Sequence, residues 1–245
     1  MHGNWRCLPL SLLLTVLTMH AAPGAAASSH DKTKLPAVRW EEGRAGCTLT
    51  RRDDGRYYYG LSDGDLVITV AIDSQELQLV RHRHVPFFAA LLTLRYKGSE
   101  PVDVMVEKIS LEFVKHFQVV ETALDPDGLS QRVQNDADEL DRQTAREVTK
   151  HPEQKDAKEA YMRAFLKDSA ELQEFLGKNS LRPAQLGRDN PETGGWVFFS
   201  ADSKWISGWK KPEEMILRVP LDGKVFEFPF TLPPKAGEVI LRKRQ

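Results

Sequence analysis

Hydrophobic and polar residues alternate with a period of two in two separate parts of the chain, residues 44–114 and 196–232. The segment 66–72, LVITVAI, shows the pattern, with its largest aliphatic side chains two residues apart. Short segments with strict alternation are typical of half-buried antiparallel strands. The pattern predicts about nine short strands, and Asp222-Gly223 predicts a two-residue turn between the last two.

Residues 128–178, between these two parts, have a different period and composition. They are rich in Glu, Lys, Gln, Arg and Ala, and Tyr161 and Phe165 belong to a hydrophobic stripe with spacings of three, four and seven residues. This spacing places side chains on one face of an α-helix. Pro152 separates it from an earlier segment with a thinner stripe, and proline is favoured as the first residue of a helix. We therefore predict two antiparallel helices, each roughly 30–40 Å long.

The segment GGWVFFS, residues 194–200, is apolar on both faces of a predicted strand. Trp196 and Phe198 would face one side, and Val197 and Phe199 the other. A strand with two apolar faces is typical of the centre of a sheet that is covered on both sides. We expect the opposite sheet to cover one face and the helical hairpin to cover the other.

Two more tryptophans, Trp205 and Trp209, follow this strand in a lysine-rich loop. Large aromatic side chains in such a loop either pack against the end of the sheets or contact a partner protein. The candidate partner-binding residues are therefore Trp205, Trp209 and, on the hairpin, Tyr161 and Phe165.

The two β-rich parts are each too small to form a core alone, so residues 44–235 are predicted to be one domain. The segments LLTLRYKGSEPVDVMVEKISLEF and GGWVFFSADSKW, with the later MILRVPLDGKVFEFPF, resemble strands of secreted bacterial immunoglobulin-like domains. The resemblance implies a mainly β fold, an immunoglobulin-like antiparallel β-sandwich, with a binding or structural role and no catalytic residues. The inserted two-helix hairpin has no counterpart in that family.

The N-terminal residues 1–27 have the layout of a secretory signal peptide. A positively charged start precedes the apolar run LPLSLLLTVLTM, which is too short to span a bilayer. Ala25 and Ala27 occupy the −3 and −1 positions of a cleavage site. We expect a periplasmic or secreted protein, with residues 28–43 as a flexible lead-in and residues 236–245 as a basic tail.

The charge composition bears on the class of partner. The chain has 34 Lys and Arg residues against 35 Asp and Glu residues, a net charge of −1. A balanced chain has no overall field that attracts nucleic acid, so nucleic acid is not an expected partner. We expect no membrane span in the mature chain and no cofactor. Cys47, the single cysteine beyond the signal peptide, is predicted to be a buried side chain or part of an intermolecular disulfide.

The segment RHRH contains the best candidate metal ligands. In an extended chain His82 and His84 would point to the same side, about 6.6 Å apart. Two imidazoles at this spacing can share Zn²⁺ or Cu²⁺, and His116 is the candidate third ligand. The alternative interpretation is a polar strand end before Pro86.

The segment GLSDG, residues 60–64, matches the Gly-x-Ser-x-Gly pattern of serine hydrolases, with Ser62 as nucleophile. A nucleophile elbow needs a strand before the serine and a helix after it. The residues that follow have the period of a strand, so a hairpin turn explains the same residues.

Three functional hypotheses follow. The leading one is a non-enzymatic, extracytoplasmic module for protein–protein contact with an envelope protein, in which the hairpin either docks the partner or only caps a sheet. The main alternative is a metal-binding protein that uses His82, His84 and His116. The third is a secreted hydrolase that acts through Ser62.

Overall fold

The structure, a computed structural model, describes residues 35–53, 56–72, 87–116, 119–200 and 213–232. The described residues belong to one compact unit, residues 35–245, and residues 1–34 lie outside the described residues. The described elements are β1 (Ala37–Arg39), β2 (Cys47–Arg51), β3 (Tyr57–Asp63), β4 (Leu66–Ile72), β5 (Phe87–Tyr96), β6 (Val102–Val104), η1 (Val106–Lys108), β7 (Ser110–Phe113), η2 (Val114–His116), β8 (Val120–Thr122), α2 (Pro126–Lys150), η3 (Pro152–Gln154), α3 (Lys155–Asn179), β9 (Ala184–Leu186), β10 (Glu192–Ser200), β11 (Glu213–Leu221) and β12 (Lys224–Leu232).

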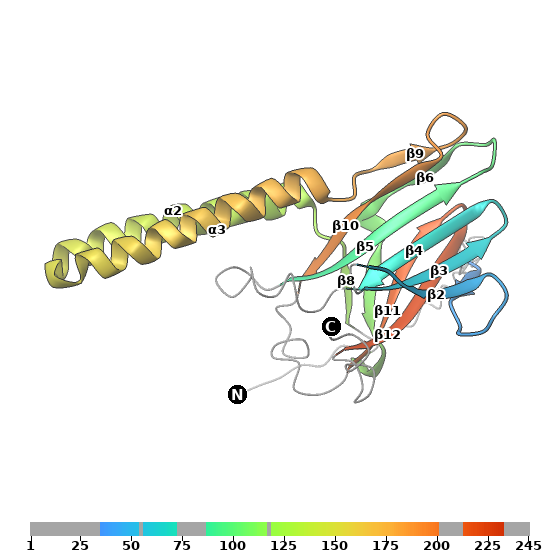
Figure 1. Ribbon diagram of the computed structural model, residues 1–245, viewed down its shortest axis with the longest axis horizontal. Helices are drawn as coiled ribbons and strands as arrows, with labels where there is room; N and C mark the ends of the chain where they lie inside the picture. Colours follow the sequence, from blue (N-terminus) through green and yellow to red (C-terminus); the bar gives the residue numbers. More distant parts are fainter. Residues whose placement is uncertain (1–34, 54–55, 73–86, 117–118, 201–212, 233–245) are drawn as a thin grey trace, which may run out of the picture. The chain divides into compact units, whose positions relative to one another are not determined.

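The strands form two sheets of five strands and one small sheet (Figure 1). The strand orders are β1-β12-β11-β7-β8 and β10-β5-β4-β3-β2, and β6 pairs with β9. The pairs within the described chain are antiparallel, except that β1 runs parallel to β12. The chain is therefore mainly β with two long helices, in agreement with the predicted fold class at this level.

One hydrophobic core lies between the two large sheets. The first sheet contributes Phe113 and Phe226, and the second contributes Ile68, Leu92 and Phe199. Each of these side chains is at most 1% exposed. Burial of a side chain of this size contributes about 1.5–3 kcal/mol, so this core is the main source of stability for the β part.

Strand β10 has two apolar faces, as predicted, but it does not lie in the centre of its sheet. Val197 and Phe199 point into the core between the sheets, and Trp196 and Phe198 belong to a second cluster with the helices. The strand itself is the first in the order β10-β5-β4-β3-β2. Apolar residues on both faces show that both faces are covered, and they carry no information about the number of hydrogen-bonded neighbours.

Residues 37–39, within the segment expected to be a flexible lead-in, form strand β1. The next residue, Trp40, is 8% exposed and packs with the main core. Its indole Nε1 donates a hydrogen bond to the carbonyl oxygen of Thr48 at 3.1 Å. Its backbone amide donates to the carbonyl oxygen of Glu227 at 2.8 Å. This strand is held by pairing with distant residues. Its three residues are too few to show an alternating pattern in the sequence.

The turn predicted at Asp222-Gly223 is confirmed. It joins β11 to β12, and its two residues have φ angles of 51° and 68°. Positive φ at both central positions is typical of a type I′ hairpin turn, which matches the twist of the flanking strands. Pro229 lies on β12 beyond the three residues that pair with β1, so its missing amide hydrogen disrupts no pairing on that side.

The two predicted helices are confirmed, with slightly wider bounds than residues 128–178. Helix α2 begins at Pro126, directly after the N-cap residue Asp125, whose Oδ2 accepts a hydrogen bond from the amide of Gly128 at 2.9 Å. Pro152 lies in η3, the single turn before α3, and is not the first residue of α3 itself. Helix α3 continues through Gly177 and ends at Asn179.

Candidate interaction site

The helical hairpin is attached to the free edge of β10 by two backbone hydrogen bonds. Where the chain enters the hairpin, the amide of Leu124 donates to the carbonyl oxygen of Phe198 at 2.7 Å. Where the chain leaves it, the amide of Leu181 donates to the carbonyl oxygen of Trp196 at 2.9 Å. These two carbonyl groups are two residues apart, so both point out of the same edge of the strand. The hairpin thus covers an edge that would otherwise be open to another strand.

Hydrophobic packing fixes the base of the hairpin on the outer face of this sheet. We call the four helix residues that make this contact the root; they are Leu129, Val133, Leu172 and Leu176. Each is at most 3% exposed. They pack against aromatic and small side chains of β5 and β10, namely Phe87, Ala89, Trp196 and Phe198.

An ion pair joins the two ends of the hairpin next to the root. Arg182, just after α3, binds Asp127, in the first turn of α2, through two hydrogen bonds of 2.7 and 2.8 Å. Two parallel bonds between a guanidinium and a carboxylate fix their relative orientation as well as their distance. The hydrogen bonds from Arg182 hold the pKa of Asp127 below its usual value.

Acid should therefore loosen this ion pair. Because the pKa of Asp127 is lower in the folded chain than in the unfolded chain, the pair contributes stability above the unfolded pKa of about 3.9. That contribution is lost as the pH falls through the lower, folded pKa. In an NMR pH titration, Arg182→Gln should move the pKa of Asp127 upward to its ordinary value. Glu174 is the control, because its pKa is lowered by Lys178 and should not respond; an unchanged Asp127 pKa would contradict the assignment.

The two helices pack on each other, in the root and beyond it, with the spacing of a coiled coil. The buried positions of α3 between Met162 and Leu176 are separated alternately by three and four residues, and the position before them is Lys158. This alternation keeps one seam of each helix facing the other. The buried seam residues of α3 are Met162, Phe165, Ser169, Leu172 and Leu176.

The seam becomes polar toward the tip of the hairpin. The Nζ atom of Lys158 donates to the Oε2 atom of Glu147 at 3.2 Å and lowers the pKa of that carboxyl group. The hydroxyl of Thr144 lies 3.9 Å from the sulfur of Met162. We call residues 137–150 and 155–168 the distal half. Of the buried residues of α2, Ala137 alone lies in this half, at its inner end.

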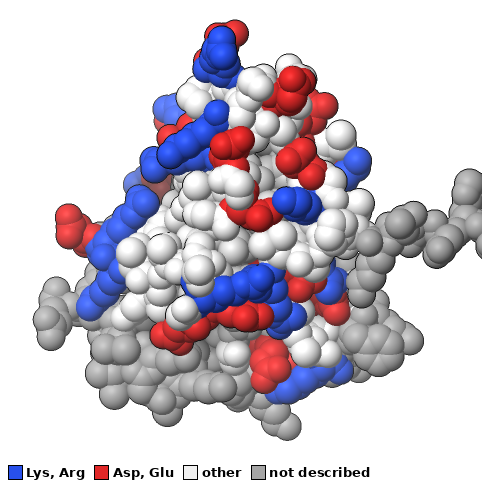
Figure 2. Space-filling view, turned by 90° about the vertical axis from the view of Figure 1, so that its right-hand side faces the viewer, with Lys and Arg blue, Asp and Glu red and all other residues white. Residues whose placement is uncertain are grey.

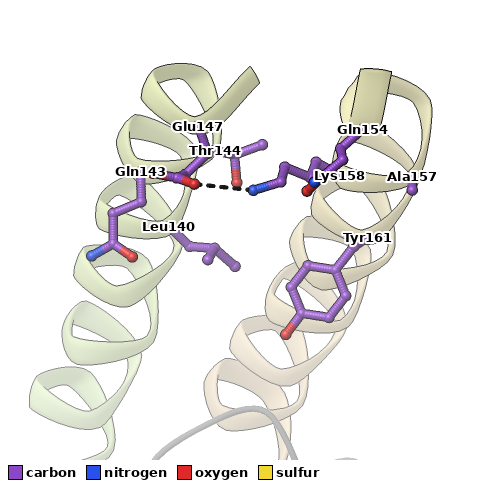
Figure 3. Close-up of a pocket in the computed structure, with 8 residues that line it drawn as sticks. All are labelled: Leu140, Gln143, Thr144, Glu147, Gln154, Ala157, Lys158 and Tyr161. Carbon is purple, nitrogen blue, oxygen red and sulfur yellow. Dashed lines mark hydrogen bonds and ion pairs between the residues drawn. The ribbon is translucent and has the colours of Figure 1, made fainter. Parts of the chain in front are cut away.

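A groove runs along each side of the distal half. The first, of about 370 Å³, we call the Tyr161 groove (Figure 3). In it Leu140 and Tyr161 point toward the space between the helices, and the Glu147–Lys158 pair lies nearer the tip. Its full lining is Leu140, Gln143, Thr144, Glu147, Gln154, Ala157, Lys158 and Tyr161.

The second groove, of about 470 Å³, we call the Leu166 groove. Its apolar lining consists of Ala145, Val148, Met162 and Leu166. Its charged lining consists of Asp141, Lys155, Glu159 and Arg163, two residues of each sign. Leu166 is 42% exposed. Both grooves thus combine an apolar floor with balanced charges.

The four predicted partner-binding residues fall into three situations. Tyr161 is 48% exposed and lines a groove. Phe165 is 4% exposed and belongs to the seam between the helices, so it supports the grooves without presenting its ring to a partner. Trp205 and Trp209 lie outside the described residues.

The groove residue that sequence reasoning missed is Leu166. Leu166 is adjacent to a seam residue and outside the predicted stripe. The alternating spacing of the seam would have identified both Tyr161 and Leu166 as its neighbours on opposite sides.

The predicted metal ligands are not brought together by the described part of the chain. His82 and His84 lie outside the described residues, and of His116 only the backbone, in η2, is described. Within the described ranges, no group of three or more His, Cys, Asp and Glu residues is placed to hold a metal ion. The metal hypothesis therefore stays a prediction.

Ser62 lies near the end of β3 and pairs with Val67 of β4. The chain turns at Gly64, which has a φ of 59°, and continues as a strand. The Gly-x-Ser-x-Gly pattern is therefore part of a β-hairpin, and the helix that a nucleophile elbow requires does not follow it.

Acidic and basic side chains are interspersed over the end of the sheets shown in Figure 2. Two of the ion pairs in the β part are Arg95 with Glu192 at 2.8 Å and Lys224 with Asp63 at 2.6 Å. The second pair joins the two large sheets, because Lys224 belongs to β12 and Asp63 to β3.

Comparisons with known proteins give no relative for the chain. No family model matches it, and no curated protein or solved structure matches it at a significant level. In the described part of the chain, no helix is both long and apolar enough to cross a membrane.

Proposed function

We propose that the protein is a non-enzymatic, extracytoplasmic module that binds another protein through the distal half of its helical hairpin. The observation that carries this proposal is the contrast along the hairpin. The residues that flank the hairpin are hydrogen-bonded to β10, its root packs against β5 and β10, and an ion pair joins its two ends. Its distal half has an apolar groove on each side.

A hairpin that only capped a sheet would need little more than its root. The root residues of α2 are Leu129 and Val133, within the first two turns, and α2 continues to Lys150. The distal half extends the hairpin by roughly 20 Å at 1.5 Å per residue. Capping of the sheet therefore accounts for the root, and binding of a partner accounts for the length of the helices beyond it.

The chemistry of the grooves favours a protein partner. Each groove has exposed apolar side chains next to one or more oppositely charged pairs. Such surfaces bind amphipathic helices, which bury their apolar face and place charges at the rim. A groove with balanced charge does not select a polyanion, since a polyanion requires an excess of Lys and Arg.

The immunoglobulin-like β-sandwich is part of the same proposal. Two mostly antiparallel sheets that share one core support it. In this arrangement the sheets serve as the rigid base, and the hairpin inserted between β8 and β9 is the binding element. The signal peptide expected at residues 1–27 supports a location outside the cytoplasm.

Shortening the hairpin should abolish partner binding. The variant replaces residues 137–168 with a four-residue Gly-Ser turn and keeps all four root residues. The two helices end at the same level in this variant, so the root can still fold. Cross-linking and pull-down from native envelope extract should recover a partner with the full chain and at least tenfold less with the variant.

Two point variants sharpen this test. Leu166→Glu places a charge in a groove and should reduce recovery of the partner. Lys167→Ala, at a side chain that is 76% exposed and lines neither groove, should not. Circular dichroism first establishes that each variant keeps its β and helix content. Equal recovery by the full and shortened chains would place the contact on the sheets and refute the role of the hairpin.

A further inference from the structure

The Leu166 groove has features that match a second copy of itself. On α3 its charges alternate in sign at intervals of four residues: Lys155, Glu159 and Arg163. Charges four residues apart lie on one face of a helix, one turn from the next. When two such rows run in opposite directions, Glu159 of one copy faces Arg163 of the other, and the same contact occurs twice by symmetry.

We propose, on the basis of the hairpin function above, that the occupant of the Leu166 groove is the same groove of a second copy of this chain. The two hairpins lie antiparallel, with α2 against α2 and α3 against α3, and form a four-helix bundle. The two-fold axis passes near Ala145, whose small side chain lets the two α2 helices approach closely.

The apolar residues fit this arrangement. Ala145 is exposed in the single chain and lies close to the two-fold axis, where it covers the same residue of the other copy. Leu166 of one copy reaches the aliphatic stem of Lys155 of the other. This contact would cover a leucine that is 42% exposed in the single chain. Lysine stems commonly cover apolar surface in this way while the ammonium group stays in water.

The ion pairs within a single chain do not oppose these contacts between two copies. Glu159 lies 3.9 Å from Lys155 and 3.8 Å from Arg163 on its own helix, near the outer limit for an ion pair. All three side chains are at least 42% exposed. Exposed pairs of this kind contribute little, so Glu159 can add a partner at little cost. The net charge of the whole chain, −1, adds almost no repulsion between copies.

The size of the contact predicts a weak dimer. Two helices of about 10 Å diameter, side by side over roughly 20–25 Å, present a face of about 400–500 Å² per copy. The total of about 800–1,000 Å² lies below the range of stable complexes. We therefore expect a dissociation constant in the micromolar range or weaker, and a monomer–dimer equilibrium that responds to concentration.

Reversing the charges at positions 159 and 163 tests the two-fold symmetry of the dimer. In sedimentation-equilibrium experiments between about 10 and 500 μM, a range chosen to bracket micromolar affinities, the purified full chain should form dimers. Glu159→Lys and Arg163→Glu should each be monomeric, because each places like charges opposite each other. An equimolar mixture of the two variants should form dimers again, because the substituted side chains then have opposite charges. Circular dichroism confirms that both variants keep their helices.

Cross-linking tests which face of the hairpin forms the contact between copies. In a Cys47→Ser background, Ala145→Cys should give a covalent dimer with a bismaleimide whose spacer of about 8 Å matches the distance between packed helices. Gln143→Cys, in the Tyr161 groove, is the matched control and should not.

A chain that stays monomeric throughout overturns the self-docking proposal. So does a dimer that persists in both single variants, or one that is cross-linked through Gln143→Cys. A monomeric chain whose hairpin still captures a different protein refutes self-docking and leaves the proposed function intact.

Discussion

Replacing Phe199 with alanine is expected to lower the free energy of unfolding by about 3–5 kcal/mol. The Phe199 side chain is fully buried between the two sheets, where its ring centroid lies 6.2 Å from that of Phe88. Alanine removes this ring and leaves a cavity that the surrounding strands can close only in part. Urea denaturation followed by circular dichroism measures the loss.

Phe198→Ala is the matched comparison, because Phe198 is equally buried but faces the hairpin. Its ring centroid lies 5.5 Å from that of Phe87 and 6.5 Å from that of Phe175 on α3. We expect a stability loss of similar size, about 3–5 kcal/mol. The parts of the chain that lose protection against hydrogen exchange should differ. Hydrogen exchange should increase more in α2 and α3 for Phe198→Ala than for Phe199→Ala. Equal exchange in the helices of the two variants would show that the hairpin does not depend on this face of β10.

Gly195→Ala should destabilise the chain by about 1–3 kcal/mol, the usual cost of overpacking. A Cβ atom at this position would lie 2.5 Å from the amide nitrogen of Leu181 and 2.7 Å from the carbonyl carbon of Ser180. Both are backbone atoms of the segment that leaves the hairpin, so β10 and this segment must separate. The hydrogen bond from Leu181 to the carbonyl oxygen of Trp196 would be weakened or lost.

Gly177→Ala is the control with the opposite sign. Gly177 lies inside α3, and a Cβ atom there would meet nothing within 4 Å. Alanine in a helix is more stable than glycine by about 0.5–1 kcal/mol, so the urea midpoint should rise. A Gly195→Ala chain as stable as the natural one would show that the 180–182 segment is not held close to β10.

Local patterns predicted the two helices and the longer strands of this fold, because each of these elements has its own period. About nine strands were expected, and the described part of the chain has twelve. The helical hairpin was recognised from its composition and stripe, and its ends differ by only two residues at Pro126 and one at Asn179. The turn at Asp222-Gly223 was recognised because a type I′ turn requires those residue types.

The arrangement of the elements was harder to predict, because it depends on pairing between distant segments. β10 was placed in the centre of a sheet, and in fact the hairpin's own ends cover its edge. β1, β8 and β9 were missed because each has three residues, which are too few to carry a pattern. Such pairings are visible only when the whole fold is known.

The candidate site was predicted in part. Tyr161 and Phe165 were predicted together as partner-binding residues because both belong to one stripe, and the structure leaves Tyr161 48% exposed but buries Phe165. A stripe with a period of 3.6 does not separate seam residues from their neighbours. A seam with alternating spacings of three and four residues does, and it places Phe165 inside and Leu166 outside.

The attachment at β10 also determines how this protein can change over evolutionary time. The two carbonyl groups that hold the hairpin belong to Phe198 and Trp196, so its entry and exit lie about 6.6 Å apart. This distance between entry and exit does not depend on the length of the two helices. Insertion of one heptad into each helix would move the tip outward by about 10 Å and nearly preserve its orientation. The reach of the molecule is thus an adjustable property, independent of the sheets that carry it.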